Sequence, residues 1–234
     1  LFASLTVILP YLWQYIEPYL PQLSATHTKP PQDVSENSKV FAMIIALIIQ
    51  FVIPSALLLT LLKFRGNLLD ILGLRGVDYG KVCIVAIVGV VTAFACLIIL
   101  SVLGYEDWMK LIFGETEKQA AVKQLLEANS GPMKAVMIVA AVVVAPIFEE
   151  IIFRSCFYAS VKRYTGPLFA ILISSLLFSL VHGSAPAALP LFIVGAILAI
   201  SYEITGSLYT NIIIHAVFNF IQVVGMLYLA NNPQ

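Results

Sequence analysis

Long apolar runs separated by short polar stretches dominate the pattern along this chain. A helix needs about 20 apolar residues to cross a bilayer core of about 30 Å. Six runs approach this length, and Leu1–Trp13 is a shorter seventh. The six are Val40–Leu62, Val82–Leu103, Ala135–Tyr158, Pro167–Val181, Ala185–Tyr202 and Ser207–Ala230. Barrel strands would alternate apolar and polar residues, so the pattern predicts an all-α transmembrane bundle of about seven or eight helices.

The polar stretches divide a single expected transmembrane domain, residues 1–234. Residues 1–39 are expected to hold a truncated first span and a linker rich in proline, and residues 130–230 form the part with chemical motifs. Because the chain begins with Leu, its natural start is expected to lie upstream. Glu115–Asn129 is a candidate amphipathic helix, either on the membrane surface or as an ordinary solvated loop helix.

Composition agrees with a polytopic membrane protein. The chain is 60% hydrophobic and 11% charged, whereas soluble domains are about 45–50% apolar and about 25% charged. Thirteen Lys and Arg balance thirteen Asp and Glu, so no net field attracts a polyanion. These values exclude a soluble enzyme, a disordered chain and a nucleic-acid binder, and they make the lipid bilayer the first expected partner.

The basic residues of the loops predict an orientation. Loops 63–81 and 161–166 fall on the same side if the spans alternate, and their Lys and Arg are concentrated in short segments. The positive-inside rule then places both loops in the cytoplasm. We expect a multi-pass protein of a bacterial or archaeal cytoplasmic membrane, and the oligomeric state is left open.

Several polar residues interrupt the apolar runs where a membrane makes them costly. An ionisable group inside a span costs about 2.5–3.5 kcal/mol on insertion scales, so each is a functional candidate. These residues are Glu149, Glu150, Arg154, His182 and His215, with Asn219 as a polar companion. At about 1.5 Å per residue, positions 149, 182, 215 and 219 share a band roughly 10–22 Å from one membrane face. This shared depth predicts one buried polar site.

Helical spacing predicts which of the acidic and basic side chains face each other. Glu150 and Arg154 are four residues apart and share a helix face, whereas Glu149 points about 100° away. Arg154 is therefore expected to neutralise Glu150 and leave Glu149 free for chemistry. The alternative is that all three side chains form a structural ion cluster.

The same spacing relates the histidines to their neighbours. His215 and Asn219 share one face, and Phe178 and His182 share another, so Phe178 is expected to wall a substrate pocket beside His182. The alternative for each polar residue is an interhelical hydrogen bond without catalytic function.

Three motifs occur in order along the second half of the chain. They are Glu149-Glu150-Ile-Ile-Phe-Arg154, Phe178-Ser-Leu-Val-His182 and His215-Ala-Val-Phe-Asn219. Together they resemble the CAAX-protease and bacteriocin-processing family of intramembrane proteases, which includes the type II CAAX prenyl endopeptidases. The resemblance covers about residues 130–220, and the first half of the chain matches only as generic spans.

The resemblance implies about eight helices around a catalytic cavity and hydrolysis of peptide bonds. It implies that Glu149 and His182 activate water, that His215 and Asn219 stabilise the oxyanion or hold the site, and that Arg154 supports them. Amide hydrolysis needs a base and oxyanion donors, which these residue types supply.

Metal dependence and substrate are open at this stage. Glu149, His182 and His215 are a possible zinc set, as two His and a carboxylate are in metallohydrolases. The sequence lacks a His-Glu-x-x-His helix, so we favour a glutamate mechanism without metal over a metalloprotease-like one. Expected substrates are peptides or lipidated proteins, including prenylated CAAX-like ones.

Two other function classes fit the same residues. One is a non-proteolytic membrane scaffold or bacteriocin-immunity protein, although a complete set of site residues disfavours a degenerate enzyme. The other is a proton-coupled transporter, since intramembrane Glu, His and Arg also form proton relays. Internal repeats, which many transporters have, are not evident in the sequence.

Overall fold

The structure, a computed structural model, describes residues 66–114 and 130–232, with scattered positions between 40 and 64 and between 122 and 128. Four sequence predictions fall wholly or mostly outside the described residues. They concern the spans Leu1–Trp13 and Val40–Leu62, the linker within residues 1–39, and the Glu115–Asn129 helix.

Every regular element in the described part of the chain is a helix, as the apolar runs predict. The elements are α5 (Leu68–Ile71), α6 (Tyr79–Val102), α7 (Tyr105–Phe113), α9 (Gly131–Val139), α10 (Ala145–Glu150), α11 (Ala159–Thr165), α12 (Pro167–Leu180), α13 (Ala185–Thr205) and α14 (Leu208–Asn231). Two π-helical segments, Ala140–Val144 and Ile151–Tyr158, join α9, α10 and α11 into one continuous helix.

Four of the described helices are long and apolar enough to cross a membrane. They are α6, the continuous helix Gly131–Thr165, α13 and α14. α12 has 14 residues, about 21 Å at 1.5 Å per residue, and is shorter than the bilayer core. The predicted run Pro167–Val181 is therefore a short helix, and His182 lies in the turn that follows it.

The short helix α7 lies in a segment that the sequence pattern presents only as polar. Its polar residues Glu106, Asp107 and Lys110 fall on one side, and exposed apolar residues such as Trp108 and Ile112 fall on the other. Tyr105 Oη donates a hydrogen bond of 3.0 Å to the carbonyl of Pro186. This bond ties α7 to the start of α13.

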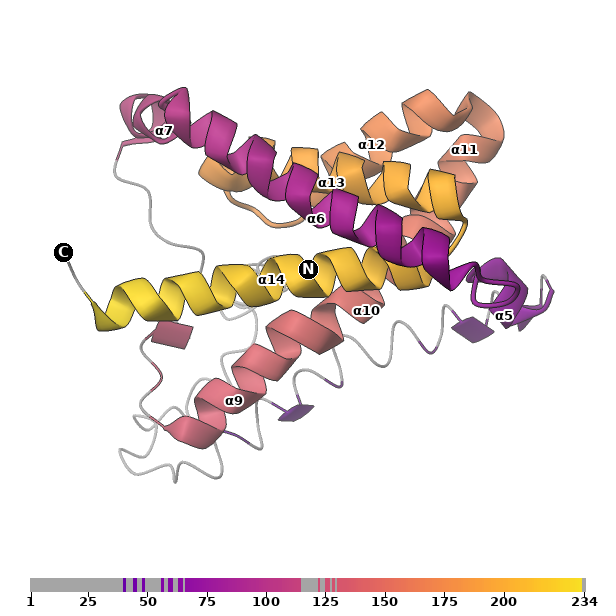
Figure 1. Cartoon of the computed structure of the whole chain (residues 1–234), viewed down its shortest axis with the longest axis horizontal. Helices are drawn as coiled ribbons and strands as arrows, with labels where there is room; N and C mark the ends of the chain where they lie inside the picture. The colour runs from indigo at the N-terminus through magenta and orange to yellow at the C-terminus, as the bar shows by residue number, and fades with distance from the viewer. Residues whose placement is uncertain are drawn as a thin grey trace, which may run out of the picture.

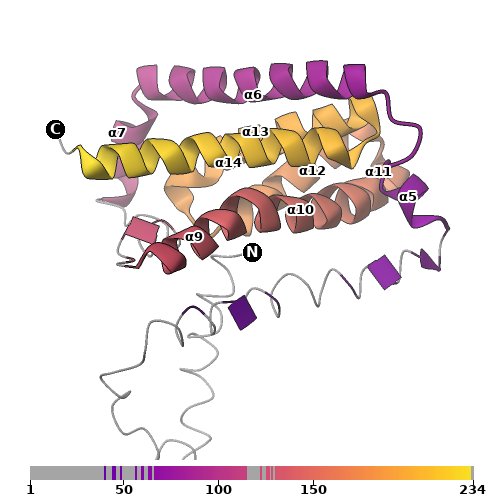
Figure 2. The ribbon, with the colours of Figure 1, turned by 60° about the horizontal axis from the view of Figure 1, so that its bottom comes forward.

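The last helix, α14, lies at the centre of the bundle (Figure 1, Figure 2). It packs against α6, α10 and α13, and also against the first π-helical segment. α12 packs along α13. The helix with the first motif therefore packs on α14, which carries the third motif, and α12, which carries the second, packs on α13 and on the segment Ile151–Tyr158.

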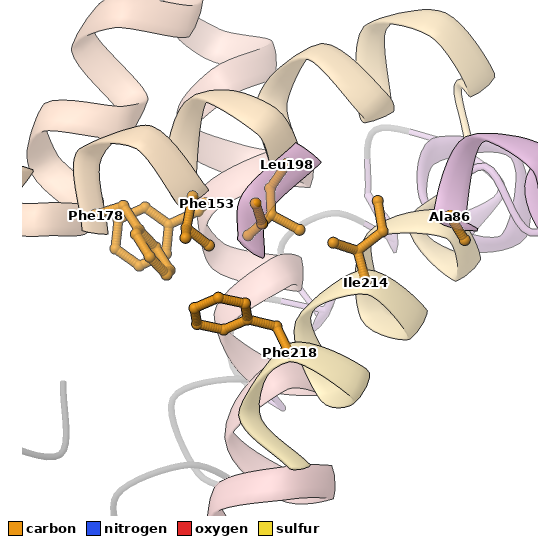
Figure 3. Packing of buried hydrophobic residues seen from close by; sticks show 8 residues of the cluster. Ala86, Phe153, Phe178, Leu198, Ile214 and Phe218 are labelled. Carbon is orange, nitrogen blue, oxygen red and sulfur yellow. The ribbon is translucent and has the colours of Figure 1, made fainter. Parts of the chain in front are cut away.

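A cluster of buried apolar side chains joins these helices. Its members are Ala86, Ala93, Phe153, Phe178, Val194, Leu198, Ile214 and Phe218, and Figure 3 shows them at close range. α6 approaches α14 so closely that a Cβ on Gly89 would lie 2.6 Å from Cδ1 of Ile214. Small residues let membrane helices pack at short distance, and α6 supplies them here.

The loops predicted to share one side of the membrane do lie at one end of the bundle. Lys162 Nζ donates to both carboxylate oxygens of Glu203, at 2.8 and 2.6 Å, and Lys81 Nζ donates to the carbonyl of Ile204 at 2.6 Å. Tyr158 Oη also donates to Glu203. Glu203 therefore has a structural role near the end of α13, where it accepts from Tyr158 and Lys162.

The same end is closed by a tight backbone contact. Gly73 and Gly206 have φ angles of 61° and 63°, and a Cβ on Gly73 would lie 1.8 Å from the carbonyl oxygen of Gly206. Leu72 and Leu208 are buried together beside them, with Ile151. This contact fixes the turn after α5 against the start of α14.

The outer surface of the bundle is strongly apolar. On α6, Ile84, Ile87 and Val91 are 65%, 65% and 62% exposed. A soluble monomer rarely exposes so large a contiguous apolar surface, whereas lipid covers it in a membrane. The helices and this surface define an integral membrane protein of several spans.

Candidate active site

Glu149, Glu150 and Arg154 lie in the middle of the long helix Gly131–Thr165. Their exposed fractions are 4%, 0% and 0%. The two glutamates end α10, and Arg154 lies in the π-helical segment Ile151–Tyr158. π-Helical turns inside α-helices occur frequently at functional sites.

Glu150 is the most heavily bonded side chain of the candidate site. Its Oε2 lies 3.0 Å from Nε of Arg154 and accepts from Nδ2 of Asn211 at 3.3 Å. Its Oε1 lies 2.9 Å from Nδ1 of His215. The predicted pairing of Glu150 with Arg154 is present, and the bonds of Glu150 to Asn211 and His215 connect the long helix to α14.

Asn211 is a site residue that the sequence reasoning missed. It is fully buried on α14, one helical turn before His215. Its Nδ2 donates to the carbonyl of Leu198 on α13 at 2.6 Å as well as to Glu150. The signal that could have found it is the spacing of four residues, which places Asn211, His215 and Asn219 along one face.

The bond to Glu150 decides which nitrogen of His215 carries hydrogen. A carboxylate can only accept, so Nδ1 of His215 is the donor in this pair. In the neutral ring, Nε2 then has a free lone pair, and it lies 3.8 Å from Oε2 of Glu149. This distance exceeds that of a hydrogen bond, so neither atom is bound to the other.

His182 has the same arrangement of ring nitrogens. Its Nδ1 lies 2.6 Å from the carbonyl oxygen of Phe178, which can only accept, so Nε2 of the neutral ring again has a free lone pair. The ring of Phe178 lies against both His182 and His215, with centroid distances of 4.9 and 5.7 Å. The turn after α12 therefore brings His182 to the part of the bundle that holds His215.

Phe178 forms the wall between these groups. Its ring centroid lies 4.9 Å from that of His182 and 5.7 Å from that of His215. Cζ of Arg154 lies 5.4 Å from the same ring. Phe178 is only 1% exposed, so its ring is fixed inside the bundle and packs against these side chains. Its predicted contact with a substrate stays a prediction.

The guanidinium of Arg154 is stabilised mainly by its ion pair with Glu150 and by two aromatic rings. Its Nη1 and Nη2 are buried and have no hydrogen-bond partner among the described residues. The rings of Phe153 and Phe178 lie 6.0 and 5.4 Å from Cζ, within the range of cation–π attraction. Arg154 thus depends on Glu150 as its anion.

Asn219 shares a helix with His215 but makes a different kind of contact. Its Nδ2 donates to the backbone carbonyl of Ala141 at 2.9 Å. The structure therefore brings Glu149, Glu150, Arg154, His182, Phe178 and His215 together, and it places the amide of Asn219 on the backbone beside them.

The proposed zinc set does not have the arrangement of a metal site. Within the described residues, no group of three His, Cys, Asp or Glu side chains is placed to hold a metal ion. Nδ1 of His182 and Nδ1 of His215 are already bonded, to Phe178 and Glu150.

The described helices define an integral membrane protein, and between them lies a buried polar site of glutamate, arginine and histidine side chains. Residues 131–221 match the family described as "Type II CAAX prenyl endopeptidase Rce1-like". A relative from Bacillus subtilis (strain 168), named "Putative membrane peptidase YdiL", is 31% identical over 124 residues, which are 52% of this chain and 49% of the relative. The match thus spans about half the length of that relative. No solved structure matches significantly.

These two matches cover the part of the chain that carries the three motifs. Both matches support the resemblance to the CAAX-protease and bacteriocin-processing family over this part of the chain.

Proposed function

We propose that this protein is an intramembrane endopeptidase that hydrolyses peptide bonds of membrane-associated or lipidated substrates. Family membership and the name of the Bacillus relative support a membrane peptidase. CAAX-like prenylated C-termini are one substrate class within this proposal. The observation that supports it most directly is the difference between the contacts of Glu149 and those of Glu150.

Glu150 and Glu149 have different surroundings although they are adjacent. Glu150 is fully buried, forms an ion pair with Arg154 and accepts from His215 and Asn211. Among the described residues, Glu149 has no such set of partners, and its Oε2 faces Nε2 of His215 at 3.8 Å. Carboxylate oxygens that are not held by donors can accept a proton from water. Glu149 is therefore the proposed general base.

In the proposed reaction, Glu149 and Nε2 of His182 orient a water molecule, and Glu149 takes its proton. The water oxygen bonds to the carbonyl carbon of the substrate, and the carbonyl oxygen becomes an oxyanion. Transfer of the proton to the amide nitrogen then allows the carbon–nitrogen bond to break. The products are a carboxylic acid and an amine.

His215 is the proposed donor to the oxyanion. Because Nδ1 of His215 faces Glu150, Nε2 donates only when the ring is protonated. The carboxylate of Glu150 holds the ring of His215 in place through Nδ1, at 2.9 Å. Glu150 and Arg154 thus act on the reaction through His215.

The test is cleavage by the purified protein in detergent micelles. A pool of prenylated and unmodified peptides is incubated with it and the products are identified by mass spectrometry. Glu149→Ala and His182→Ala should each lower the rate by at least about 100-fold, the usual range for a general base. Glu106→Ala, on the exposed surface of α7, is the matched control and should cleave normally.

Two outcomes contradict the proposal. Cleavage by Glu149→Ala at the wild-type rate would remove the proposed base. A folded wild-type sample that yields no product from any peptide class would favour the scaffold or immunity function, and proton-dependent flux in liposomes would favour a transporter.

A further inference from the structure

One backbone carbonyl beside the site lacks its usual helical donor. In the π-helical segment Ala140–Val144, the N–H of Ala145 donates to the carbonyl of Ala140, five residues earlier. The next bond of this pattern would join the N–H of residue 146 to the carbonyl of Ala141. Residue 146 is proline, which has no N–H. The carbonyl of Ala141 therefore receives no donor in this pattern.

Asn219 supplies the missing donor from another helix. Its Nδ2 lies 2.9 Å from the carbonyl oxygen of Ala141. Inside a membrane an unpaired backbone group costs several kcal/mol because no bulk water replaces the partner. The amide of Asn219 thus gives the carbonyl of Ala141 the donor that Pro146 cannot supply, because proline has no N–H.

The position of this bond relates it directly to the candidate active site. Pro146 precedes Glu149 by three residues, and Asn219 follows His215 by four. The bond therefore joins the helix that carries Glu149 to the helix that carries His215, about two turns before Glu149 and about one turn after His215. A change here would alter the 3.8 Å separation of Glu149 Oε2 and His215 Nε2.

We propose that Asn219 is a positioning residue that clamps α14 to the carbonyl left free by Pro146, and so sets the separation of Glu149 and His215. This role differs from the oxyanion contact that the family resemblance implies for Asn219. The clamp itself is independent of the reaction, whereas its effect on rate rests on the proposed function.

A double-mutant cycle on stability tests the clamp without any assay of activity. Asn219→Ala should lower the ratio of folded to unfolded protein about tenfold or more, because a buried acceptor loses its donor. Pro146→Ala restores an N–H that can reach the carbonyls of the preceding turn. In that background, Asn219→Ala should cost less than about threefold.

The matched control is Asn232→Ala. Asn232 Nδ2 also donates to a backbone carbonyl, that of Tyr228 at 3.0 Å, but at an exposed helix end. Its removal should leave the unfolding equilibrium nearly unchanged, with and without Pro146→Ala. Additive effects of Asn219→Ala and Pro146→Ala would overturn the clamp. If Asn219→Ala alone does not fold, failure of Pro146→Ala to restore folding has the same meaning.

Kinetics of the folded variants then separate a positioning role from a merely structural one. Asn219→Ala should lower kcat about tenfold with KM unchanged, and Pro146→Ala should recover most of this loss. A loss of about 1000-fold in both backgrounds would place Asn219 on the reacting atoms and overturn the positioning role. If the wild-type protein cleaves nothing, the proposed function fails while the stability cycle still decides the clamp.

Discussion

The pairing of Glu150 with Arg154 makes the stability of the bundle depend on one carboxylate. We expect Glu150→Gln to be strongly destabilising although glutamine has nearly the same shape. Nε of Arg154 lies 3.0 Å from Glu150, both side chains are fully buried, and Nη1 and Nη2 have no hydrogen-bond partner in the described structure. The substitution leaves a buried guanidinium without its anion.

The expected magnitude follows from this geometry. Removing one partner of a buried ion pair costs about 3–5 kcal/mol. Folded proteins are stable by about 5–15 kcal/mol in total. The variant should therefore lose about a fifth or more of its free energy of unfolding. The rings of Phe153 and Phe178 compensate only in part, because a desolvated cation–π contact contributes about 2 kcal/mol.

The assay is reversible unfolding in mixed micelles with increasing denaturing detergent, followed by circular dichroism. Asp70→Asn is the matched control, because Asp70 faces Arg75 at 3.9 Å on the exposed surface and such pairs contribute at most about 1 kcal/mol. Glu150→Gln combined with Arg154→Met should recover much of the loss, since an apolar side chain of similar length replaces the stranded charge. A free energy of unfolding for Glu150→Gln within about 1 kcal/mol of wild type would refute this reasoning.

Two further predictions concern the end of the bundle and the metal question. Gly73→Ala should prevent the turn after α5 from docking on α14, because its Cβ would lie 1.8 Å from the carbonyl oxygen of Gly206; a thermal melt should show a loss of several degrees, and an unchanged melt would contradict the contact. Treatment with a strong zinc chelator followed by dialysis should leave the peptide cleavage rate unchanged under the favoured glutamate mechanism. A loss of rate that added Zn²⁺ restores would instead support Glu149, His182 and His215 as a metal set.

Contacts within one helix are the part of the site that sequence spacing predicts best. Glu150 and Arg154 pair because residues four apart share a face, and the wider π-helical turn does not separate them. The long apolar runs likewise predict α6, α13 and α14 closely, since a membrane span leaves few alternatives. These features depend on local geometry that the sequence contains directly.

Contacts between helices were harder to predict. Asn211 lies in an apolar run like many other polar residues, and only the crossing of α13 and α14 brings it to Leu198 and Glu150. His182 was expected within a span, but α12 ends at Leu180 and the turn presents the ring to the site. The way in which the helices pack against each other decides which side chains become partners. The spacing of residues along a single helix does not contain this information.

The central place of α14 has a consequence for the order in which the protein is made. Translation produces the helix with Glu149, Glu150 and Arg154 well before α14, the described helix that supplies Asn211 and His215. Until then, three ionisable side chains oppose entry of that helix into the bilayer, at about 2.5–3.5 kcal/mol each. Stable integration of the helix Gly131–Thr165 is therefore expected only after α14 has been synthesised. A chain that stops before residue 208 lacks the partners that α14 gives to these charges.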